Sequence, residues 1–176
     1  MEHKSFELKL DEVTPDGQFQ GYAAVFDNVD FGKDVIAKGA FAETLKETGG
    51  KIPILNHHDP AHQIGWNLEA REDEHGLFVR GQLDLNVQAA RERHSLMRMA
   101  AKVGGKSGLS IGFQTLREEA YPEDFSIRQL KEVRLFEYSL VTFPMNPQAG
   151  VTRVKARQGS LRRSLELLRD AFECDA

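Results

Sequence analysis

A serine between two glycines is the first candidate for chemistry in this sequence. Ser110 lies in the stretch 108–113, with an apolar residue on either side and a glycine two positions away in each direction. Glycine has no side chain to keep another backbone at a distance, so this stretch could present the hydroxyl to an incoming peptide bond. By itself the stretch is also typical of a buried strand that carries a small polar residue. Ser107 is the rival serine, but it lies nearer the glycines at 104 and 105, where we expect it to cap a turn.

A serine hydroxyl becomes a good nucleophile when a neighbouring base accepts its proton. Histidine suits that role because its ordinary pKa of about 6.5 is close to working pH. His57 and His58 are the candidates, because they directly follow a short apolar strand and could be held rigidly beside a cleft. The same residues also fit a polar loop without chemistry, or a metal site made of His57, His58, Asp59 and His62. Adjacent ligands tend to diverge, which disfavours the metal site.

The base also needs an acceptor for its second ring nitrogen. Glu137 lies in the run 135–141, where both alternating faces are mainly apolar. A carboxylate in such a strand is costly unless it is paired, so Glu137 is either the acceptor for the histidine N–H or the partner of a nearby arginine such as Arg134. Asp59 is the alternative acid, but neighbouring residues of an extended chain point to opposite sides, so we do not expect it to reach the ring of His58.

The elements that must position these residues are mostly short strands. Apolar patterns predict strands near 6–10, 18–26, 52–55, 64–70, 77–84, 108–116, 127–133 and 135–141. Helices are predicted at 39–46, ending at two glycines, and at 87–103, with an apolar stripe of Leu96, Met99, Ala100 and Val103. Because strands and helices do not alternate regularly, we expect an α+β or mainly β fold, a mostly antiparallel sheet or barrel with peripheral helices.

The composition is typical of an ordinary globular protein. The chain has 176 residues, 40% hydrophobic and 28% charged, which is enough for one domain with a real core. The net charge of −4 argues against a nucleic-acid partner, and no apolar run approaches the roughly 18–20 residues that span a bilayer. The first residues lack the apolar core of a signal peptide. Cys174 is the only cysteine, which excludes an internal disulfide and a thiolate zinc cluster and favours an intracellular protein.

The chain divides into two predicted segments. Residues 1–150 would form the barrel core with its peripheral helices. Residues 151–176 begin with a basic stretch that runs to position 163 and continue as an amphipathic helix whose apolar face is formed by Leu161, Leu165, Leu168 and Phe172. We expect this tail to pack on the domain or to act in assembly.

Short motifs follow one another in a defined order along the chain. They are residues 21–26 (GYAAVF), residues 39–41 (GAF) leading to Thr44-Leu45, His58-Asp59-Pro60 followed by Ile64-Gly65, Gly76-Leu77, residues 108–113 (GLSIGF), and residues 137–141 (EYSLV) followed by Pro144 and Asn146. Each motif is short, but the ordered set spans roughly three quarters of the chain. The set resembles the prohead maturation proteases of tailed bacteriophages.

This resemblance implies a serine endopeptidase built on a small, mainly antiparallel β-barrel surrounded by helices, related in fold to the herpesvirus assembly proteases. It implies that Ser110 is the nucleophile, His58 the general base and Glu137 the orienting acid. His58 matches the base because it is the histidine followed by Asp-Pro and then Ile-Gly, although the doubled histidine leaves His57 as an alternative. The oxyanion hole is expected in the strand around Ser110 or in the loop 142–146. No cofactor and no metal are implied.

The resemblance also implies partners and a place of action. Such proteases cut scaffolding segments or capsid protein, and themselves, inside a procapsid that assembles in the host cytoplasm. The implied partners are therefore a capsid or scaffolding protein and other copies of this chain, with no nucleic acid and no membrane. Two alternatives remain: a catalytically inactive assembly protein that keeps the fold, and a metal-dependent hydrolase centred on residues 57–62. The joint presence of Ser110, His58 and Glu137 favours the active protease.

Overall fold

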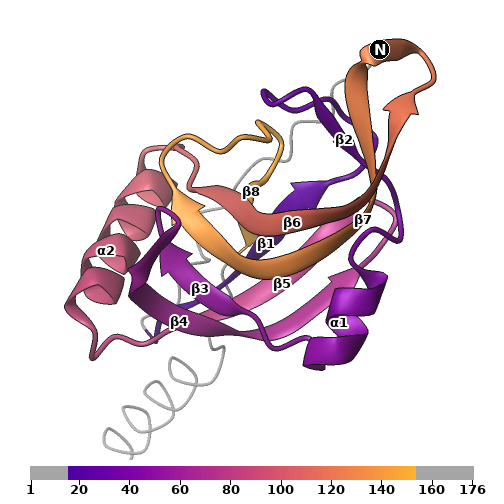
Figure 1. Cartoon of the computed structure of the whole chain (residues 1–176). Coiled ribbons are helices and arrows are strands. Elements are labelled where there is room, and N and C mark those ends of the chain that lie inside the picture. The colour runs from indigo at the N-terminus through magenta and orange to yellow at the C-terminus, as the bar shows by residue number, and fades with distance from the viewer. Residues whose placement is uncertain (1–15, 154–176) are drawn as a thin grey trace, which may run out of the picture.

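The computed structural model describes residues 16–153, and its centre is a β-barrel (Figure 1). Two helices, α1 (Ala42–Thr48) and α2 (Gln88–Lys102), lie outside the sheet, on opposite sides of the barrel in this view. The eight strands in this range are β1 (Gln18–Val25), β2 (Asp34–Ile36), β3 (Pro53–Asn56), β4 (Asp59–Glu72), β5 (Gly76–Leu83), β6 (Gly108–Tyr121), β7 (Asp124–Val141) and β8 (Gly150–Arg153).

Seven of these strands close the barrel. The hydrogen-bonded order around the ring is β7, β3, β4, β5, β1, β8 and β6, and β6 pairs again with β7. β2 lies outside the ring and extends the sheet from β7. β2 and β3 both run parallel to β7, whereas the other pairings are antiparallel. The predicted mainly antiparallel barrel is confirmed, with two parallel contacts that the sequence pattern did not predict.

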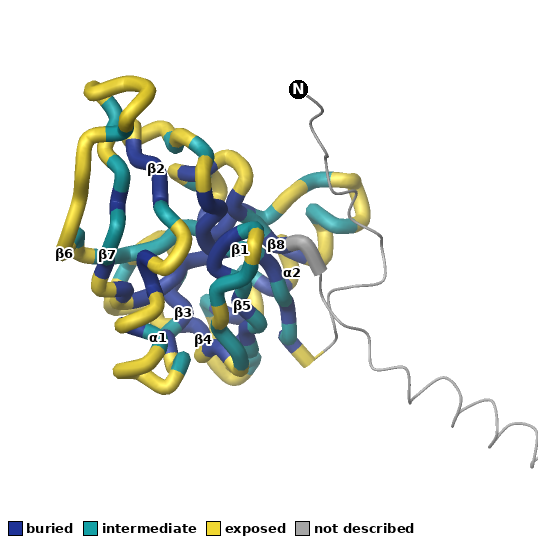
Figure 2. Tube along the Cα trace, turned by 90° about the vertical axis from the view of Figure 1, so that its right-hand side faces the viewer, coloured by how far each residue is buried: buried dark blue, intermediate teal, exposed yellow. Residues whose placement is uncertain are grey.

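Alternation along the ring strands fills the barrel with apolar side chains. Phe19 and Val79 are buried from one side of the ring, and Leu109, Tyr138 and Leu140 are fully buried from the other. Figure 2 shows this buried centre, with the exposed residues gathered in the loops, in α1 and at the tip of the β6–β7 hairpin. The rims of the barrel therefore carry the polar loops that can hold a site.

One pair of predicted strands differs from the structure. The residues predicted as two strands, 127–133 and 135–141, form one strand of 18 residues, β7. A register shift places Gly112 opposite Glu137 and Phe113 opposite Leu135, so Phe136 is a bulge that interrupts the alternation without ending the strand. β3 begins at Pro53 and is paired on both edges, by β4 and β7.

Helix α2 is confirmed, but the predicted apolar stripe is on the wrong side. The side chains buried by its packing are those of Ala90, His94 and Met97, at helical spacing. The predicted stripe is exposed instead: Leu96, Met99 and Val103. Both sets repeat with the period of a helix, and the small side chain of Ala90 lets the other face approach the sheet. Periodicity alone could not distinguish the two faces.

The predicted strand at 6–10 and the amphipathic helix with Leu161, Leu165, Leu168 and Phe172 lie outside the described residues. The same holds for most of the predicted segment 151–176. Within residues 16–153, neither helix is long and apolar enough to cross a membrane.

Candidate active site

The candidate site lies on the outer face of the β6–β7 ladder. Ser110 is opposite Ser139 in this ladder, and Gly112 is opposite Glu137. Opposed residues of an antiparallel pair point to the same side, and residues two apart in a strand share a face. Because the intervening Leu109 points into the core, these four residues face away from the barrel. The spacing of two within each strand therefore gathers them on one surface.

His58 reaches this surface from the turn between β3 and β4. Asn56 and Asp59 pair across the turn, so His57 and His58 are its two central residues, with φ of 55° and 59°. Two successive positive φ values are the pattern of a type I′ turn, which matches the twist of the strands that it joins. Positive φ costs roughly 1–2 kcal/mol in a residue other than glycine, so the surroundings must hold the turn. One such contact is the His57 N–H, which donates to the Leu140 carbonyl at 3.2 Å.

Three hydrogen bonds join His58, Glu137 and Ser139 to one another. Nδ1 of His58 is 2.7 Å from Oε1 of Glu137. The main-chain N–H of His58 donates to Ser139 Oγ at 2.9 Å, and Ser139 Oγ donates to Glu137 Oε2 at 2.7 Å. The Glu137 side chain is 9% exposed, whereas that of His58 is 41% exposed. The carboxylate is thus shielded from water while the imidazole remains open to the pocket.

The carboxylate occupies space that Gly112 leaves free. A Cβ at Gly112 would lie 2.1 Å from Glu137 Oε1, and its next nearest atoms also belong to Glu137. Any side chain at this position would push the carboxylate away from His58. This requirement explains one of the two glycines that flank Ser110.

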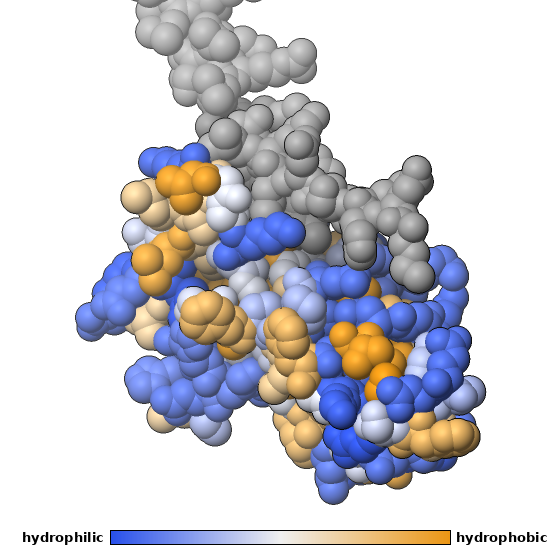
Figure 3. All heavy atoms as spheres, turned by 90° about the horizontal axis from the view of Figure 1, so that it is seen from above, coloured by the Kyte–Doolittle hydropathy of each residue, from blue (hydrophilic) through white to orange (hydrophobic). Residues whose placement is uncertain are grey.

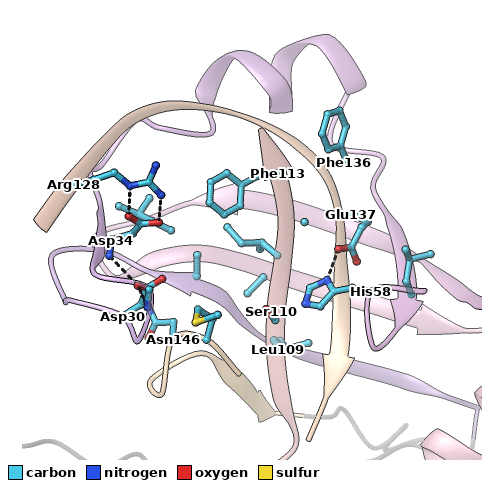
Figure 4. Close-up of a pocket in the computed structure, with 18 of the residues that line it drawn as sticks. Asp30, Asp34, His58, Leu109, Ser110, Phe113, Arg128, Phe136, Glu137 and Asn146 are labelled. Atoms are coloured by element: carbon cyan, nitrogen blue, oxygen red, sulfur yellow. Dashed lines mark hydrogen bonds and ion pairs between the residues drawn. The ribbon is translucent and has the colours of Figure 1, made fainter. Parts of the chain in front are cut away.

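Ser110, His58 and Glu137 line one pocket of about 690 Å³ (Figure 4). The pocket lies between β6 and the ends of β1 and β2, whose Ala23 and Ile36 form part of the opposite wall. β6 pairs with β8 only at Gly108, so beyond this residue no described strand covers its edge away from β7. The pocket therefore opens onto free main-chain groups beside the serine.

The far wall of the pocket is charged. Arg128 makes two hydrogen bonds of 2.8 Å to the carboxylate of Asp34, joining β7 to β2. These bonds raise the pKa of the Arg128 guanidinium above its ordinary value. Asp30 accepts the N–H groups of Gly32 and Asp34 through Oδ1, and burial raises the pKa of its carboxyl. Figure 4 shows this group across the pocket from His58 and Glu137.

The alternative residues considered from the sequence lie elsewhere. Asp59 binds Nδ1 of His62 at 2.6 Å and the N–H of Ala61 at 2.9 Å, so its carboxylate is turned to its own strand. His57, Asp59, His62 and Ser107 are not among the residues that line the pocket in the described part of the chain. No group of three or more His, Cys, Asp or Glu side chains within residues 16–153 is arranged to hold a metal ion.

The loop 142–149 borders the pocket and is tied down by an amide pair. Asn146 Nδ2 donates to the Asn28 side chain at 2.9 Å and to the Val25 carbonyl at 3.4 Å, and Asn28 Nδ2 donates back to Asn146 Oδ1 at 3.1 Å. The N–H of Phe31 also donates to the Met145 carbonyl. Both amide hydrogens of Asn146 are therefore engaged in holding the loop.

Ser139 is the site residue that the sequence analysis missed. Its signal was present, because residues 137 and 139 share a face of the same strand. In an apolar run such as 135–141, however, a small polar side chain is equally typical of core packing. Its contact with the main chain of His58 joins residues 81 positions apart, which no local pattern reveals.

Comparison with known proteins gives matches over most of the chain. A family model described as caudovirus prohead serine protease matches residues 4–163. The prohead protease of Enterobacteria phage HK97 is 33% identical over 168 residues, covering 93% of this chain and 69% of its own. The capsid polyprotein of Pseudomonas phage PAJU2 is 33% identical over 116 residues, which cover 65% of this chain and 17% of the polyprotein. Among solved structures, a protease of Kaposi's sarcoma-associated herpesvirus aligns with a TM-score of 0.49 and 15% identity, over 76% of this chain and 63% of that one.

Proposed function

Because this chain belongs to the caudovirus prohead serine proteases, we propose that it cleaves peptide bonds with Ser110 as nucleophile, His58 as general base and Glu137 as orienting acid. The observation that carries this assignment is the 2.7 Å contact between His58 Nδ1 and the buried carboxylate of Glu137, in the pocket that Ser110 lines. A histidine held by a buried acid beside an accessible serine is the arrangement that acyl transfer needs.

The tautomer follows from the hydrogen bonds. A carboxylate only accepts, so Nδ1 of His58 carries the proton that points to Glu137 and Nε2 keeps a free lone pair. Ser110 Oγ then attacks the scissile carbonyl carbon while its proton passes to Nε2. The tetrahedral intermediate collapses to an acyl-enzyme, and the leaving amine takes that proton. Water repeats the sequence on the ester, releasing the acid and restoring Ser110.

The free edge of β6 supports binding of the substrate as an extended chain. An extended peptide can pair with unpaired main-chain groups of a strand, which sets its register against Ser110. A second pocket, of about 230 Å³ and lined by Gly108, Phe143 and Phe31, lies further along β6 toward its start. Phe31 and Phe143 are 75% and 90% exposed. Figure 3 shows apolar side chains set in a largely hydrophilic surface. Phe31 and Phe143 line the second pocket, where they offer contacts to substrate residues beyond the scissile bond.

The substrates we infer are a capsid or scaffolding protein and the chain itself, cleaved inside the assembling procapsid in the host cytoplasm. Two matches support this inference: the prohead protease of phage HK97, and a polyprotein named for the capsid that contains a matching segment. Cleavage of one copy by another, like self-association, would require contact between copies of this chain. The predicted boundary at residue 150 falls within β8, so we assign the barrel up to Arg153 to the protease domain and the remaining residues to 176 to a segment that packs on it or acts in assembly.

Co-expression with the capsid protein of the same phage tests the catalytic assignment. The size of the capsid protein is followed for the wild type, Ser110→Ala and Ser107→Ala. We expect Ser110→Ala to abolish processing and Ser107→Ala to retain it, because only Ser110 lines the pocket. Processing by Ser110→Ala at the wild-type rate would refute the nucleophile, and a folded but inactive wild type would favour the inactive assembly protein.

The two histidines are separated by a second pair of variants. His58→Ala should abolish processing, because it removes the ring that is bonded to Glu137. His57→Ala should leave processing within a few fold of wild type, because His57 does not line the described pocket. Equal losses would contradict the assignment of His58.

A further inference from the structure

Ser139 is a buried hydroxyl that the proposed chemistry does not itself use. It lies on β7 opposite Ser110 and is fully buried. Its Oγ accepts the main-chain N–H of His58 at 2.9 Å and donates to Glu137 Oε2 at 2.7 Å. The single hydroxyl proton of Ser139 is already donated to the carboxylate, and its oxygen already accepts the His58 N–H. Ser139 is therefore unsuited to act as a nucleophile.

The same hydroxyl completes a ring of hydrogen bonds around the acid. Oε1 of Glu137 binds His58 Nδ1, and Oε2 accepts from Ser139, so each carboxylate oxygen has one fixed partner. Ser139 in turn holds the backbone of the residue whose ring binds Oε1. Movement of the carboxylate and movement of the turn are thus coupled through one side chain.

The turn needs such a contact because its backbone is strained. His58 has a φ of 59°, a conformation that side-chain-bearing residues seldom adopt and that persists only when the surroundings hold it. The neighbouring His57 is held by its N–H to the Leu140 carbonyl, an ordinary strand-like contact. For His58 the contact is to a side chain, and that side chain also binds the acid.

We infer that Ser139 is a positioning residue: it locks the His58 turn and the Glu137 carboxylate in one geometry, so that the imidazole faces Ser110 productively. This inference rests on the proposed function of His58 and Glu137. Catalytic groups must be placed closely, since a misplacement of about 1 Å can cost roughly 10²-fold in rate. Loss of the Ser139 hydroxyl should lower turnover with little effect on substrate binding.

Two near-isosteric variants separate positioning from packing. Ser139→Cys keeps the volume but replaces a strong hydrogen-bonding oxygen with a weak sulfur, and Ser139→Ala removes the group. Thr44→Val is the matched control, because Thr44 Oγ1 is also a buried hydroxyl that donates to the Val133 carbonyl, at 2.9 Å, and accepts the Leu135 N–H, at 3.2 Å. Thr44 bonds β7 away from the pocket, so its loss affects stability alone.

The rate of capsid-protein cleavage is measured against substrate concentration for each full-length variant and normalised to folded protein. We expect Ser139→Cys and Ser139→Ala to lower kcat by roughly 10- to 100-fold with KM within about twofold of wild type. Thr44→Val should lower Tm without lowering kcat. The low-field NMR signal of the His58 Nδ1 proton should weaken or shift in both Ser139 variants and stay unchanged in Thr44→Val.

The outcomes distinguish this inference from the catalytic assignment. Wild-type kcat in Ser139→Cys would overturn the positioning role, even where Ser110→Ala is inactive. A loss confined to Ser139→Ala would also overturn it, since the cysteine would then have rescued volume rather than hydrogen bonding. An active Ser110→Ala would instead overturn the proposed function on which the inference rests.

Discussion

Gly112 decides where the carboxylate of Glu137 can lie. Its missing side chain leaves the space that Glu137 Oε1 occupies, at 2.1 Å from the position of a Cβ. The obstructed atoms are the end of a flexible side chain, so Gly112→Ala should preserve the fold while displacing the acid from His58. We expect cleavage of capsid protein to fall by about 10²- to 10⁴-fold, the range that loss of an orienting acid produces.

A double-mutant cycle checks that this loss runs through Glu137. Glu137→Ala alone should be nearly inactive, and Gly112→Ala added to it should cost little more, because no carboxylate remains to be displaced. Such strong non-additivity is expected of residues that act as a unit. Independent, additive losses would mean that Gly112 acts on the backbone of β6 rather than on the acid.

The sequence predicted individual site residues where chemistry and local pattern coincide. A histidine at a strand end, a serine between glycines and a carboxylate in an apolar strand each stand out from their neighbours. Their order along the chain, with its resemblance to prohead proteases, selected Ser110, His58 and Glu137 among them. The shared strand face of residues 137 and 139 places Ser139 beside the acid, but its bond to His58 and the role of Gly112 depend on contacts between β7, β6 and a distant turn that the sequence does not reveal.

At the scale of the element, the β3–β4 turn is built from residues that do not favour it. His57 and His58 both have positive φ, a conformation that asparagine and glycine adopt far more readily. His57 does not line the described pocket, so it can be changed without touching the proposed machinery. We predict that His57→Asn stabilises the protein by roughly 0.5–1 kcal/mol, while capsid cleavage stays within about twofold of wild type. Urea unfolding of both proteins measures the difference.

His57→Ala is the matched control for this turn. Alanine removes the same ring but tolerates positive φ poorly, so it should be less stable than His57→Asn. Equal stability of the two variants would show that the ring, rather than the backbone conformation, determines the effect.

The titration of His57 predicts that the stability of the protein depends on pH. Burial, then the nearby Arg93 and His58, lower the pKa of His57 in the folded protein. The folded state therefore binds fewer protons than the unfolded state as pH falls through about 6.5, and the wild type loses stability there. His57→Asn lacks this titration, so its advantage in unfolding free energy should grow between pH 7.5 and 5.5. An advantage that shrinks over this range would contradict the prediction.

At the scale of the whole molecule, the ring of strands closes through a pairing of a single residue pair, Gly108 of β6 with Gly150 of β8. β8 has four residues and joins β1 to β6, and β6 continues beyond it with a free edge along the pocket. Within β6, the edge away from β7 is therefore paired with β8 at Gly108 and, among the described strands, is free beside the pocket from Ser110 onward. The sequence predicted β1 and β6 but not β8, because residues 150–153 are brought to β1 only by a pairing with residues 20–22 that no local pattern reveals.

The close approach of β1 and β8 gives the last prediction, and it concerns the stability of the whole barrel. A Cβ at Gly21 would lie 2.2 Å from the Gly150 carbonyl oxygen and 2.7 Å from the Val151 Cα, both of which are main-chain atoms that cannot rotate away. Gly21→Ala must therefore push β8 off β1, and we expect it to lower the unfolding free energy by at least about 2 kcal/mol and Tm by several degrees. Gly105→Ala is the control, because its nearest neighbour would be at an ordinary 3.4 Å, and its effect should stay within about 0.5 kcal/mol. If thermal unfolding shows the two variants to be equally stable, closure through β8 does not hold the barrel together.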